Sequence, residues 1–425
     1  MWHSTRIARS AWRPTWPMWP ASRSPARSCA TCLRNRRRMV PARGRQGFTL
    51  IELMVTMVLA LVVVGAVYML YAQSVTGYRI ESQVLDMQAR LRFGLEHIKR
   101  DFRRSAFMAT PNSSVDTDVC PQPANPVRAV TLLPNNGSVY QPWSGANPYI
   151  QPSAITLFGD FFSGRVYKTA GVQDNKVFLA LTDAFPLSEV EFNRIFLPYA
   201  GVSARFLRIV TQDQFEMYLP IQEAAYDERS ITVDQSVPML GGGTLCGVAG
   251  FGEGLDVNVA GFVRYRILND GRTGAPVGKT DLVREELQLN GTDAIPGSQL
   301  VIADYAVDLQ FYDFGFDTDS SGKAPSIQVF PLFNQAADAG GGGLLGTTLN
   351  ATPENLRFLT VKLTVRTDQE DPNHTFAIRQ TLFDALDGFE LSTMEGSCRT
   401  TSLASRVELT SLAVRNLKAV GGGGP

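Results

Sequence analysis

The chain has 425 residues, 44% of them hydrophobic, which is enough for one large or two ordinary folded domains. Its zero formal net charge hides an asymmetry, because residues 1–47 contain eleven Arg, no Lys and no acidic residue, and the remainder carries 29 basic against 40 acidic residues. An acidic folded part argues against nucleic-acid binding.

Residues 1–38 are rich in Arg, Trp and Pro and show no period of two or 3.6 residues. Three interpretations stay open: a disordered basic tail, an extended targeting presequence, and translated upstream sequence outside the natural product, which we favour with a start at Met39. The pair Cys29 and Cys32 has no second ligand pair and no surrounding βαβ pattern, so it does not indicate a zinc or redox site.

Residues 39–47 form a short basic leader in which Arg43 and Arg45 precede an apolar run. From Leu53 to Ala72 there are twenty residues without a charge, about the number that crosses a bilayer as a helix. We therefore expect residues 48–72 to be a transmembrane helix. The basic leader places its N-terminus in the cytoplasm and everything after Ala72 outside. A cleavable secretory signal fits less well, because the apolar run is too long and lacks a small-residue cleavage site.

Residues 47–52 read GFTLIE directly after the basic leader and before the apolar span. This string resembles the type III (prepilin) signal of type IV pilins and type II secretion pseudopilins. The resemblance implies that a membrane aspartyl peptidase, the prepilin peptidase, cuts between Gly47 and Phe48. It further implies that Phe48 is then N-methylated and that the apolar segment stays attached.

Glu52 is a carboxylate at the start of this apolar stretch. A charge there costs up to about 2.5 to 3.5 kcal/mol at the bilayer centre and usually has a partner. Cleavage creates one, since the Phe48 ammonium of a neighbouring subunit in a staggered stack lies within its reach. The resemblance assigns this assembly role to the matching glutamate. A Glu52 merely solvated by lipid headgroups is the simpler alternative.

Residues 73–107 predict an amphipathic helix that continues the span. No proline occurs between Gly47 and Pro111, so one helix from Phe48 to about Ala106 is expected, with Gly65 and Gly77 as its weak points. His97 is a lone helical histidine, which more often lies at a surface or interface than binds a ligand. The apolar stripe follows at spacings of three and four: Ile80, Val84, Met87, Leu91, Leu95, Ile98 and Phe102.

Residues 108–420 predict a β-rich extracytoplasmic domain, and residues 421–425 a flexible tail. The expected fold class is α+β: a pilin-like long N-terminal helix, first transmembrane and then amphipathic, packed on an antiparallel β-sheet domain with long insertions. The expected strands are Val127–Leu133, Lys176–Leu181, Ala204–Thr211, Val257–Leu268, Leu282–Leu289, Ala306–Phe314, Arg357–Arg366 and Arg406–Leu417.

Two segments are similar to parts of the PilW-type minor pilins. One is residues 304–312 (DYAVDLQFY), and the other is a closing pattern of Val365-Arg366 with residues 412–416 (LAVRN). These matches are less specific than the N-terminal signal. The resemblance implies a minor pilin of a type IV pilus that acts in assembly initiation or in a tip complex. The implied partners are the prepilin peptidase, other minor and major pilins and the inner-membrane assembly platform. The implied location is the inner membrane, then the pilus at the cell surface.

Enzymatic chemistry is not expected. A hydrolytic triad needs a base beside its nucleophile, and His374 is the only histidine after residue 107. No zinc spacing or phosphate-binding loop occurs, and no cofactor is expected. Asp317 and Asp319 imitate the start of an EF-hand loop, but position twelve is Gln328, so an acidic β-turn is preferred to a calcium site.

Three cysteines, Cys120, Cys246 and Cys398, fall outside the membrane in this topology, where disulfides persist. They allow one intramolecular bond, and we prefer Cys120 to Cys246 although spacing does not decide it.

Two alternatives to the minor pilin remain at this stage. One is a type II secretion pseudopilin. The other is a membrane-anchored periplasmic binding protein or hydrolase, for which Gly47-Phe48 and Glu52 would serve no purpose.

Overall fold

The structure is a computed structural model in which the chain forms two compact units, residues 1–70 and 71–425. Helix α1 (Leu50–Arg103) has residues in both units. The structure describes residues 48–133, 150, 152–180, 187–199, 202–212, 214–234, 252–269, 278–317, 326–332, 350, 352–371, 388–389 and 397–414.

Helix α1 begins two residues later and ends three residues earlier than expected. Its sequence holds no proline, and Arg100 and Arg103 in its last turn interact favourably with the negative end of the helix dipole. The helix stops where the backbone turns left-handed, with a φ of 57° at Ala106 and 50° at Met108. The freed carbonyl of Arg103 accepts a hydrogen bond of 2.8 Å from the Ser411 hydroxyl.

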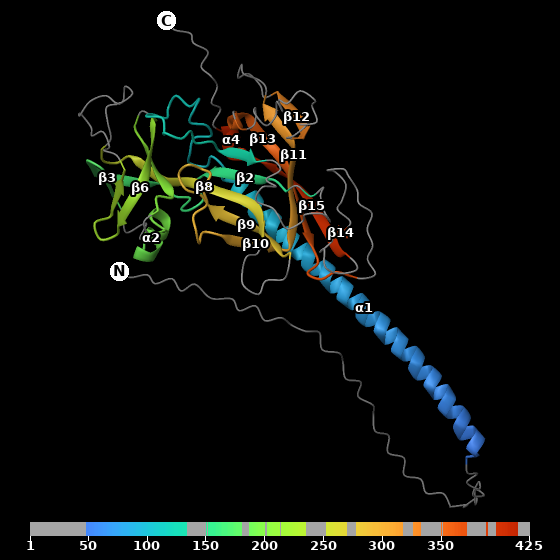
Figure 1. Ribbon diagram of the computed structural model, residues 1–425. Helices are drawn as coiled ribbons and strands as arrows, with labels where there is room; N and C mark the ends of the chain where they lie inside the picture. Colours follow the sequence, from blue (N-terminus) through green and yellow to red (C-terminus); the bar gives the residue numbers. More distant parts are fainter. Residues whose placement is uncertain are drawn as a thin grey trace, which may run out of the picture. The chain divides into compact units, whose positions relative to one another are not determined.

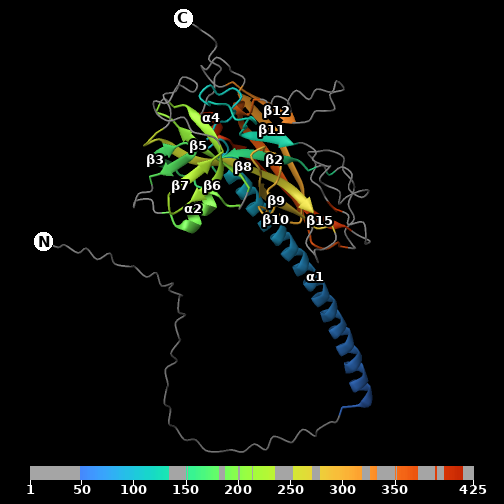
Figure 2. The same cartoon turned by 60° about the vertical axis from the view of Figure 1, so that its left-hand side comes forward.

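Within the second unit, α1 lies where two β-sheets meet (Figures 1 and 2). Five of the seven predicted stripe residues are buried there and Ile80 and Val84 are partly buried, so the amphipathic prediction is confirmed. A close approach occurs at Gly94, where an added Cβ would lie 2.8 Å from Leu363 Cδ2 and 3.4 Å from Ala303 Cβ. Glycine permits the helix to contact both sheets at this point.

The first sheet centres on β8 (Asp256–Asn269), whose second half pairs with β2 on one side and β9 on the other. Ile155 lies opposite Tyr265, and Val263 opposite Glu286. We call this part the platform, and its order is β1-β2-β8-β9-β10. Its other strands are β1 (Val130–Leu133), β2 (Ala154–Gly159), β9 (Thr280–Glu286) and β10 (Leu300–Asp304).

The first half of β8 belongs to a second arrangement, because it pairs with β3 on one side and with β5 on the other. The pairings β3-β4, β4-β7, β7-β6 and β6-β5 then close a ring of six strands, which we call the barrel. Apolar side chains of these strands and of α2 form a core of their own. The elements are β3 (Tyr167–Gln173), β4 (Lys176–Leu179), α2 (Glu189–Phe196), β5 (Arg205–Val210), β6 (Glu216–Ala225) and β7 (Ser230–Val233).

The second sheet has the order β12-β11-β13-β15-β14. Its central strand β13 is the predicted alternating strand, and Leu359, Val361, Leu363 and Val365 are fully buried. These residues share one core with the platform and the second half of α1. The elements are β11 (Ala306–Asp317), β12 (Ile327–Leu332), η1 (Pro353–Asn355), β13 (Leu356–Arg366), β14 (Gly388–Phe389), β15 (Cys398–Glu408) and α4 (Thr410–Val414).

The α+β prediction is confirmed: all pairings between these strands are antiparallel, and α1 packs on them. The predicted strand Arg406–Leu417 is wrong at Thr410–Val414, and residues 415–417 lie outside the described residues. Thr410–Val414 is instead the helix α4, whose Leu412 is fully buried in the shared core. A short apolar run does not distinguish a strand from a buried helical turn.

Candidate functional site: the N-terminal helix

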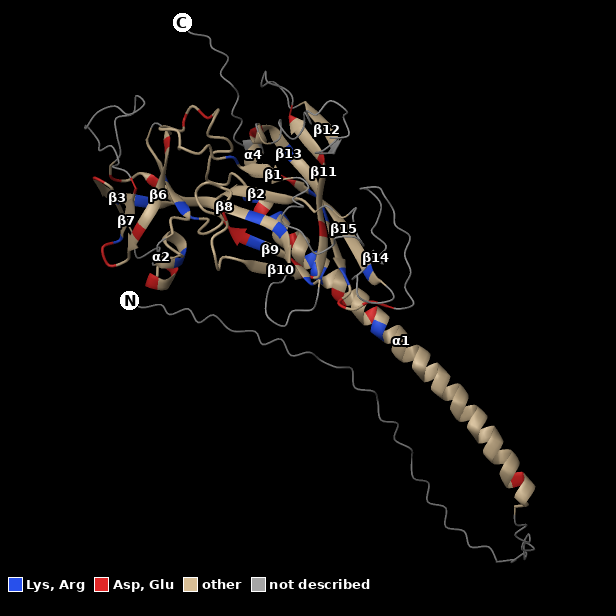
Figure 3. Ribbon diagram, viewed as in Figure 1, with Lys and Arg blue, Asp and Glu red and all other residues tan. Residues whose placement is uncertain are grey.

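The first part of α1 is apolar and uncovered. Every large hydrophobic side chain from Phe48 to Tyr71 is between 50% and 78% exposed. From Phe48 to Tyr71 the sequence has no basic residue and one acidic residue, Glu52, and Figure 3 shows the red position near the start of the helix. Among the described residues, α1 is the one helix long and apolar enough to cross a membrane. An apolar surface of this extent needs a lipid or protein environment.

Glu52 lies in the first turn of α1 and is exposed. Its backbone N–H donates a 3.4 Å hydrogen bond to the Thr49 hydroxyl, and a negative charge there is favoured by the helix dipole. Within the part of the chain that the structure describes, Glu52 has no ion-pair partner. Its carboxylate is therefore available to a cation from outside the chain.

The predicted cleavage site lies at the edge of the described chain. Phe48 is the first described residue and is 78% exposed, whereas Gly47 lies outside the described residues. Cleavage between Gly47 and Phe48 and methylation of Phe48 therefore stay predictions.

At its other end, α1 is held to the platform by a buried polar network. Asp101 is 2% exposed, and its Oδ2 accepts hydrogen bonds of 2.7 Å from the Tyr265 hydroxyl and from Arg284 Nε. His97 Nδ1 lies 2.8 Å from the same Tyr265 oxygen, and His97 Nε2 lies 3.1 Å from Arg100 Nη2. We call these five residues the helix lock: Asp101 and His97 join α1 to Tyr265 on β8 and Arg284 on β9, and Arg100 contacts His97 within α1.

Burial sets the protonation states in the helix lock. It raises the pKa of Tyr265 well above its usual range, and the nearby Asp101 carboxylate adds to this, so the phenol keeps its proton. Burial also lowers the pKa of the His97 imidazole; the Asp101 carboxylate acts against this shift, whereas the positive charges of Arg100 and Arg284 add to it.

A second polar network joins the barrel to the segment after α1. Arg208 forms a paired contact with Glu216, with Nη2–Oε1 at 2.6 Å and Nε–Oε2 at 2.8 Å. Asn258 accepts from Arg208 Nη1 and donates to the Met108 carbonyl, both at 2.9 Å. The Tyr218 hydroxyl donates to Glu216 and accepts from the Thr110 backbone, and burial raises the pKa of Tyr218 to about 12.

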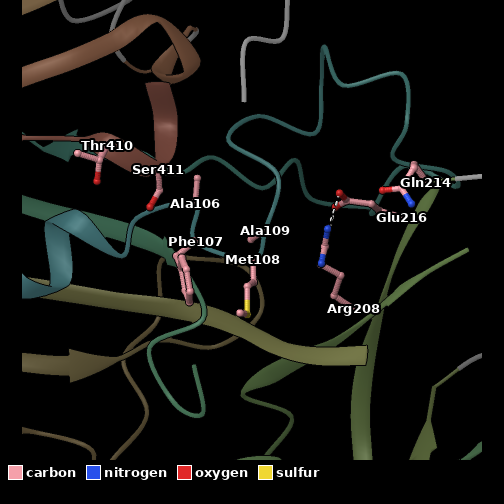
Figure 4. A pocket seen from close by; sticks show the side chains of 9 residues that line it. All are labelled: Ala106, Phe107, Met108, Ala109, Arg208, Gln214, Glu216, Thr410 and Ser411. Atoms are coloured by element: carbon pink, nitrogen blue, oxygen red, sulfur yellow. Dashed lines mark hydrogen bonds and ion pairs between the residues drawn. The ribbon is translucent and has the colours of Figure 1, made fainter. Parts of the chain in front are cut away.

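An open pocket of about 440 Å³ lies beside this network. Figure 4 shows Arg208 and Glu216 pointing toward each other on one wall, with residues 106–109 and the start of α4 on the other sides. Because the two charged groups satisfy each other, the pocket offers a ligand no free charge. These contacts indicate that the residues around the pocket hold the barrel to the segment after α1, and not that they bind a ligand.

The other predicted site residues lie elsewhere. Asp317 accepts from Arg357 Nη2 at 3.1 Å and from the Ser326 backbone at 3.2 Å, and Asp319 lies outside the described residues. A calcium ion at Asp317 would have to displace that arginine. Within the described ranges, no group of three or more His, Cys, Asp or Glu side chains could hold a metal ion.

Of the cysteines, Cys120 forms a disulfide and Cys398 is a buried free thiol. Cys246 lies outside the described residues, so its pairing with Cys120 stays a prediction.

The helix lock was not predicted from the sequence, apart from the expectation that His97 lies at a surface or interface. One signal was available. Asp101 lies seven residues after Gly94 and three after Ile98, so it lies on the buried face of the helix. A charged residue in that position requires a buried partner. Nothing in the sequence identifies Tyr265 and Arg284 as the partners, because their position depends on the pairing of β8 with β9.

Comparison with known proteins gives one match. Residues 42–68 match the prokaryotic N-terminal methylation motif. This match supports a type IV pilin-like or pseudopilin-like protein, and it implies processing by the prepilin peptidase in a pilin assembly context. Together with the long apolar helix it fits a membrane-anchored protein. No curated protein and no solved structure matches the chain.

Proposed function

We propose that the chain is a minor pilin of a type IV pilus, of the PilW type, that acts in pilus assembly initiation or in the tip complex. The observation that carries this proposal is the methylation motif at residues 42–68, which continues into a helix whose apolar side chains are uncovered. A protein that only needs an anchor requires neither the cleavage motif nor a carboxylate at Glu52.

In the proposed mechanism the prepilin peptidase cuts between Gly47 and Phe48 and the new N-terminus is methylated. The exposed face of residues 48–72 then leaves the bilayer and packs among the helices of neighbouring subunits. The Glu52 carboxylate pairs with the Phe48 ammonium of the adjacent subunit as the chain enters the filament. Such a pair is worth several kcal/mol in a low-dielectric setting.

The proposed topology places the N-terminus in the cytoplasm, because Arg43 and Arg45 precede the span. The second unit, which we call the body, then lies in the periplasm before it reaches the cell surface. The proposed partners are the prepilin peptidase, the other minor and major pilins and the inner-membrane assembly platform. The chain acts in this proposal as a structural subunit and not as an enzyme.

The size of the body supports a rare subunit over one repeated along the filament. The barrel occupies residues inserted between β2 and β8 of the platform, in addition to the second sheet that packs on α1. Bulk of this kind is tolerated at a filament end, where one side of the subunit has no neighbour.

The first prediction concerns Gly47. We expect Gly47→Val to leave uncut precursor in the membrane, because a branched side chain crowds the peptidase site. Immunoblotting separates precursor from mature protein. Normal cutting of this variant, with a mature N-terminus at Phe48, would show that the motif is not used as proposed.

The second prediction separates maturation from assembly. Glu52→Gln keeps the shape and removes the charge, so cutting should proceed while incorporation into sheared filaments falls at least about tenfold, the effect of about 1.4 kcal/mol. Glu81→Gln is the matched control, since Glu81 is exposed further along α1. Equal incorporation of the Glu52 and Glu81 variants would rule out the pairing mechanism.

Two alternatives are separated by a deletion strain. Loss of surface pili with normal protein secretion supports the minor pilin, whereas loss of type II secretion with normal pili supports a pseudopilin. If both are normal and the chain stays uncut, a membrane-anchored periplasmic binding protein or hydrolase becomes the better hypothesis.

A further inference from the structure

The second half of α1 has an apolar face that points away from the two sheets. Met87 and Leu91 pack on the sheets and are 2% and 1% exposed, whereas Leu85 is 65% exposed. Leu85 and Met87 lie two residues apart, which turns an α-helix by about 200°, so their side chains point to nearly opposite sides. This half of the helix is therefore apolar on two sides, and packing on the sheets uses one of them.

Four large apolar side chains form this outer face, and we call them the outer stripe: Tyr71, Tyr78, Leu85 and Phe93. They are 66%, 73%, 65% and 62% exposed. They extend over about 33 Å of helix at about 1.5 Å per residue. All but Tyr71 lie beyond residue 72, where the predicted membrane span ends, so lipid does not cover them in the proposed topology. A row of exposed apolar side chains of this length marks a contact with another protein.

The spacing of the outer stripe is that of a coiled coil. Tyr71, Tyr78 and Leu85 follow at intervals of seven residues, and Ser82 and Ala89 lie four residues after Tyr78 and Leu85. In a heptad the large residues then occupy position d and the small ones position a. Ser82 and Ala89 are exposed, and small side chains at a contact let a second helix approach closely. The face therefore fits another α-helix.

The proposed topology sets the direction and the height of that helix. Two subunits whose spans both have cytoplasmic N-termini extend their helices from the bilayer in the same direction. Because α1 is one helix from Leu50 to Arg103, residues equally far past two such spans lie at the same height. A helix that meets the outer stripe while both subunits are still in the bilayer is therefore parallel to α1 and in register with it.

Charge argues against a second copy of this chain as the partner. With Tyr78 and Leu85 at position d, Glu81 is at position g and Asp86 at position e. In a parallel pair a g residue lies beside the e residue of the next heptad in the other helix, so Glu81 of each copy would meet Asp86 of the other. Like charges there select against self-pairing. The contact of Asp86 with Arg90 in its own helix reduces this repulsion without removing it.

We propose that the outer stripe binds the amphipathic helix of a different membrane-anchored pilin-like subunit, parallel and in register, before either subunit enters a filament. The facing residues of that subunit are apolar along the outer stripe and basic or uncharged opposite Glu81 and Asp86. The inference rests on the proposed function, because the topology supplies the common height. It adds a contact outside the membrane to the packing proposed for residues 48–72, and it makes a pair of unlike subunits the assembling unit.

The direct test is photo-crosslinking in membranes from which filaments have been sheared, with p-benzoylphenylalanine in place of Phe93 in the full chain. Phe93 lies 45 residues after Phe48. We expect an adduct with a different protein that carries the methylation motif, at a residue within about one helical turn of the same distance from its own cleavage site. An adduct in the apolar span of that protein, with a second copy of this chain or with lipid alone would overturn the proposal, as would no adduct.

A matched pair of variants shows whether the outer stripe makes the contact. Leu85→Glu should lower the adduct yield at position 93 at least about tenfold, because it places a charge in an apolar contact. Gln73→Glu adds the same charge at an exposed position about 200° around the helix from Tyr71, and it should leave the yield unchanged. Equal yields from the two variants would contradict the proposal. A lowered thermal unfolding midpoint for Leu85→Glu would show that this side chain supports the fold instead.

The failure of this inference is distinguishable from the failure of the proposed function. The adduct is scored in membranes, whereas the minor pilin role is scored by the pili of the deletion strain. An adduct at the expected position in a strain whose pili do not depend on the chain would keep the pair and reject the minor pilin. Loss of pili on deletion, without the adduct, would reject the pair alone.

Discussion

Asp101 forms the buried polar link between α1 and the platform. Its side chain is 3% exposed and is paired with Arg284, which is 14% exposed. Two buried charges cost several kcal/mol each in desolvation, and the pair is tolerated because the Tyr265 hydroxyl satisfies the carboxylate further. Removing one member leaves the other as an uncompensated buried charge.

We therefore expect Asp101→Asn to lower the free energy of unfolding by about 3 to 5 kcal/mol. Asp86→Asn provides the control, because Asp86 pairs with Arg90 on the same helix but its side chain is 57% exposed. The control should cost at most about 1 kcal/mol. Chemical denaturation in detergent measures both, and a similar small loss for the two variants would show that the helix lock contributes little.

At the scale of elements, the contact of α1 with both sheets depends on the absence of a side chain at Gly94. We expect Gly94→Ala to destabilise the body by about 1 to 3 kcal/mol, because the added methyl group meets Leu363 on β13. Gly77→Ala is the control on the same helix, since nothing lies within 4 Å of its added Cβ. The alanine at position 77 should be neutral or slightly stabilising.

Thermal unfolding followed by near-ultraviolet circular dichroism distinguishes the two glycine variants. If Gly94→Ala is as stable as Gly77→Ala, the helix and sheet are less closely packed than described.

Helices and strands could be predicted from the sequence where their apolar residues follow a clear period. The apolar stripe from Met87 to Phe102 has the helical period, and β13 alternates clearly, so both were predicted. In contrast, β2 is buried along its whole length and its sequence does not alternate, so it was missed. The barrel was also missed, because it closes only when the first half of β8 pairs with β3 and β5. The second half of the same strand pairs with β2 and β9.

The candidate site was predictable where its chemistry is local. The methylation motif at residues 42–68 is one continuous stretch that contains Gly47, Phe48 and Glu52, whereas the helix lock assembles residues 97–101 with β8 and β9. Long-range partners of this kind depend on strand register, which a single sequence does not fix.

At the scale of the whole molecule, function and stability are assigned to different parts of the chain. The first unit presents the methylation motif and an uncovered apolar helix, and the second unit contains the hydrophobic cores and the buried ion pairs. Uncovered apolar side chains contribute nothing to the fold of the body. In the proposed function, their presence is explained by membrane residence followed by helix packing in a filament.

The measurement that tests this account most directly is mass spectrometry of the N-terminal peptide of the protein isolated from its native membrane. We expect a chain that begins at Phe48, carries one methyl group on its amine and keeps residues 48–72. A chain that retains residues upstream of Phe48, or one cut after the apolar segment near Ala72, would contradict it.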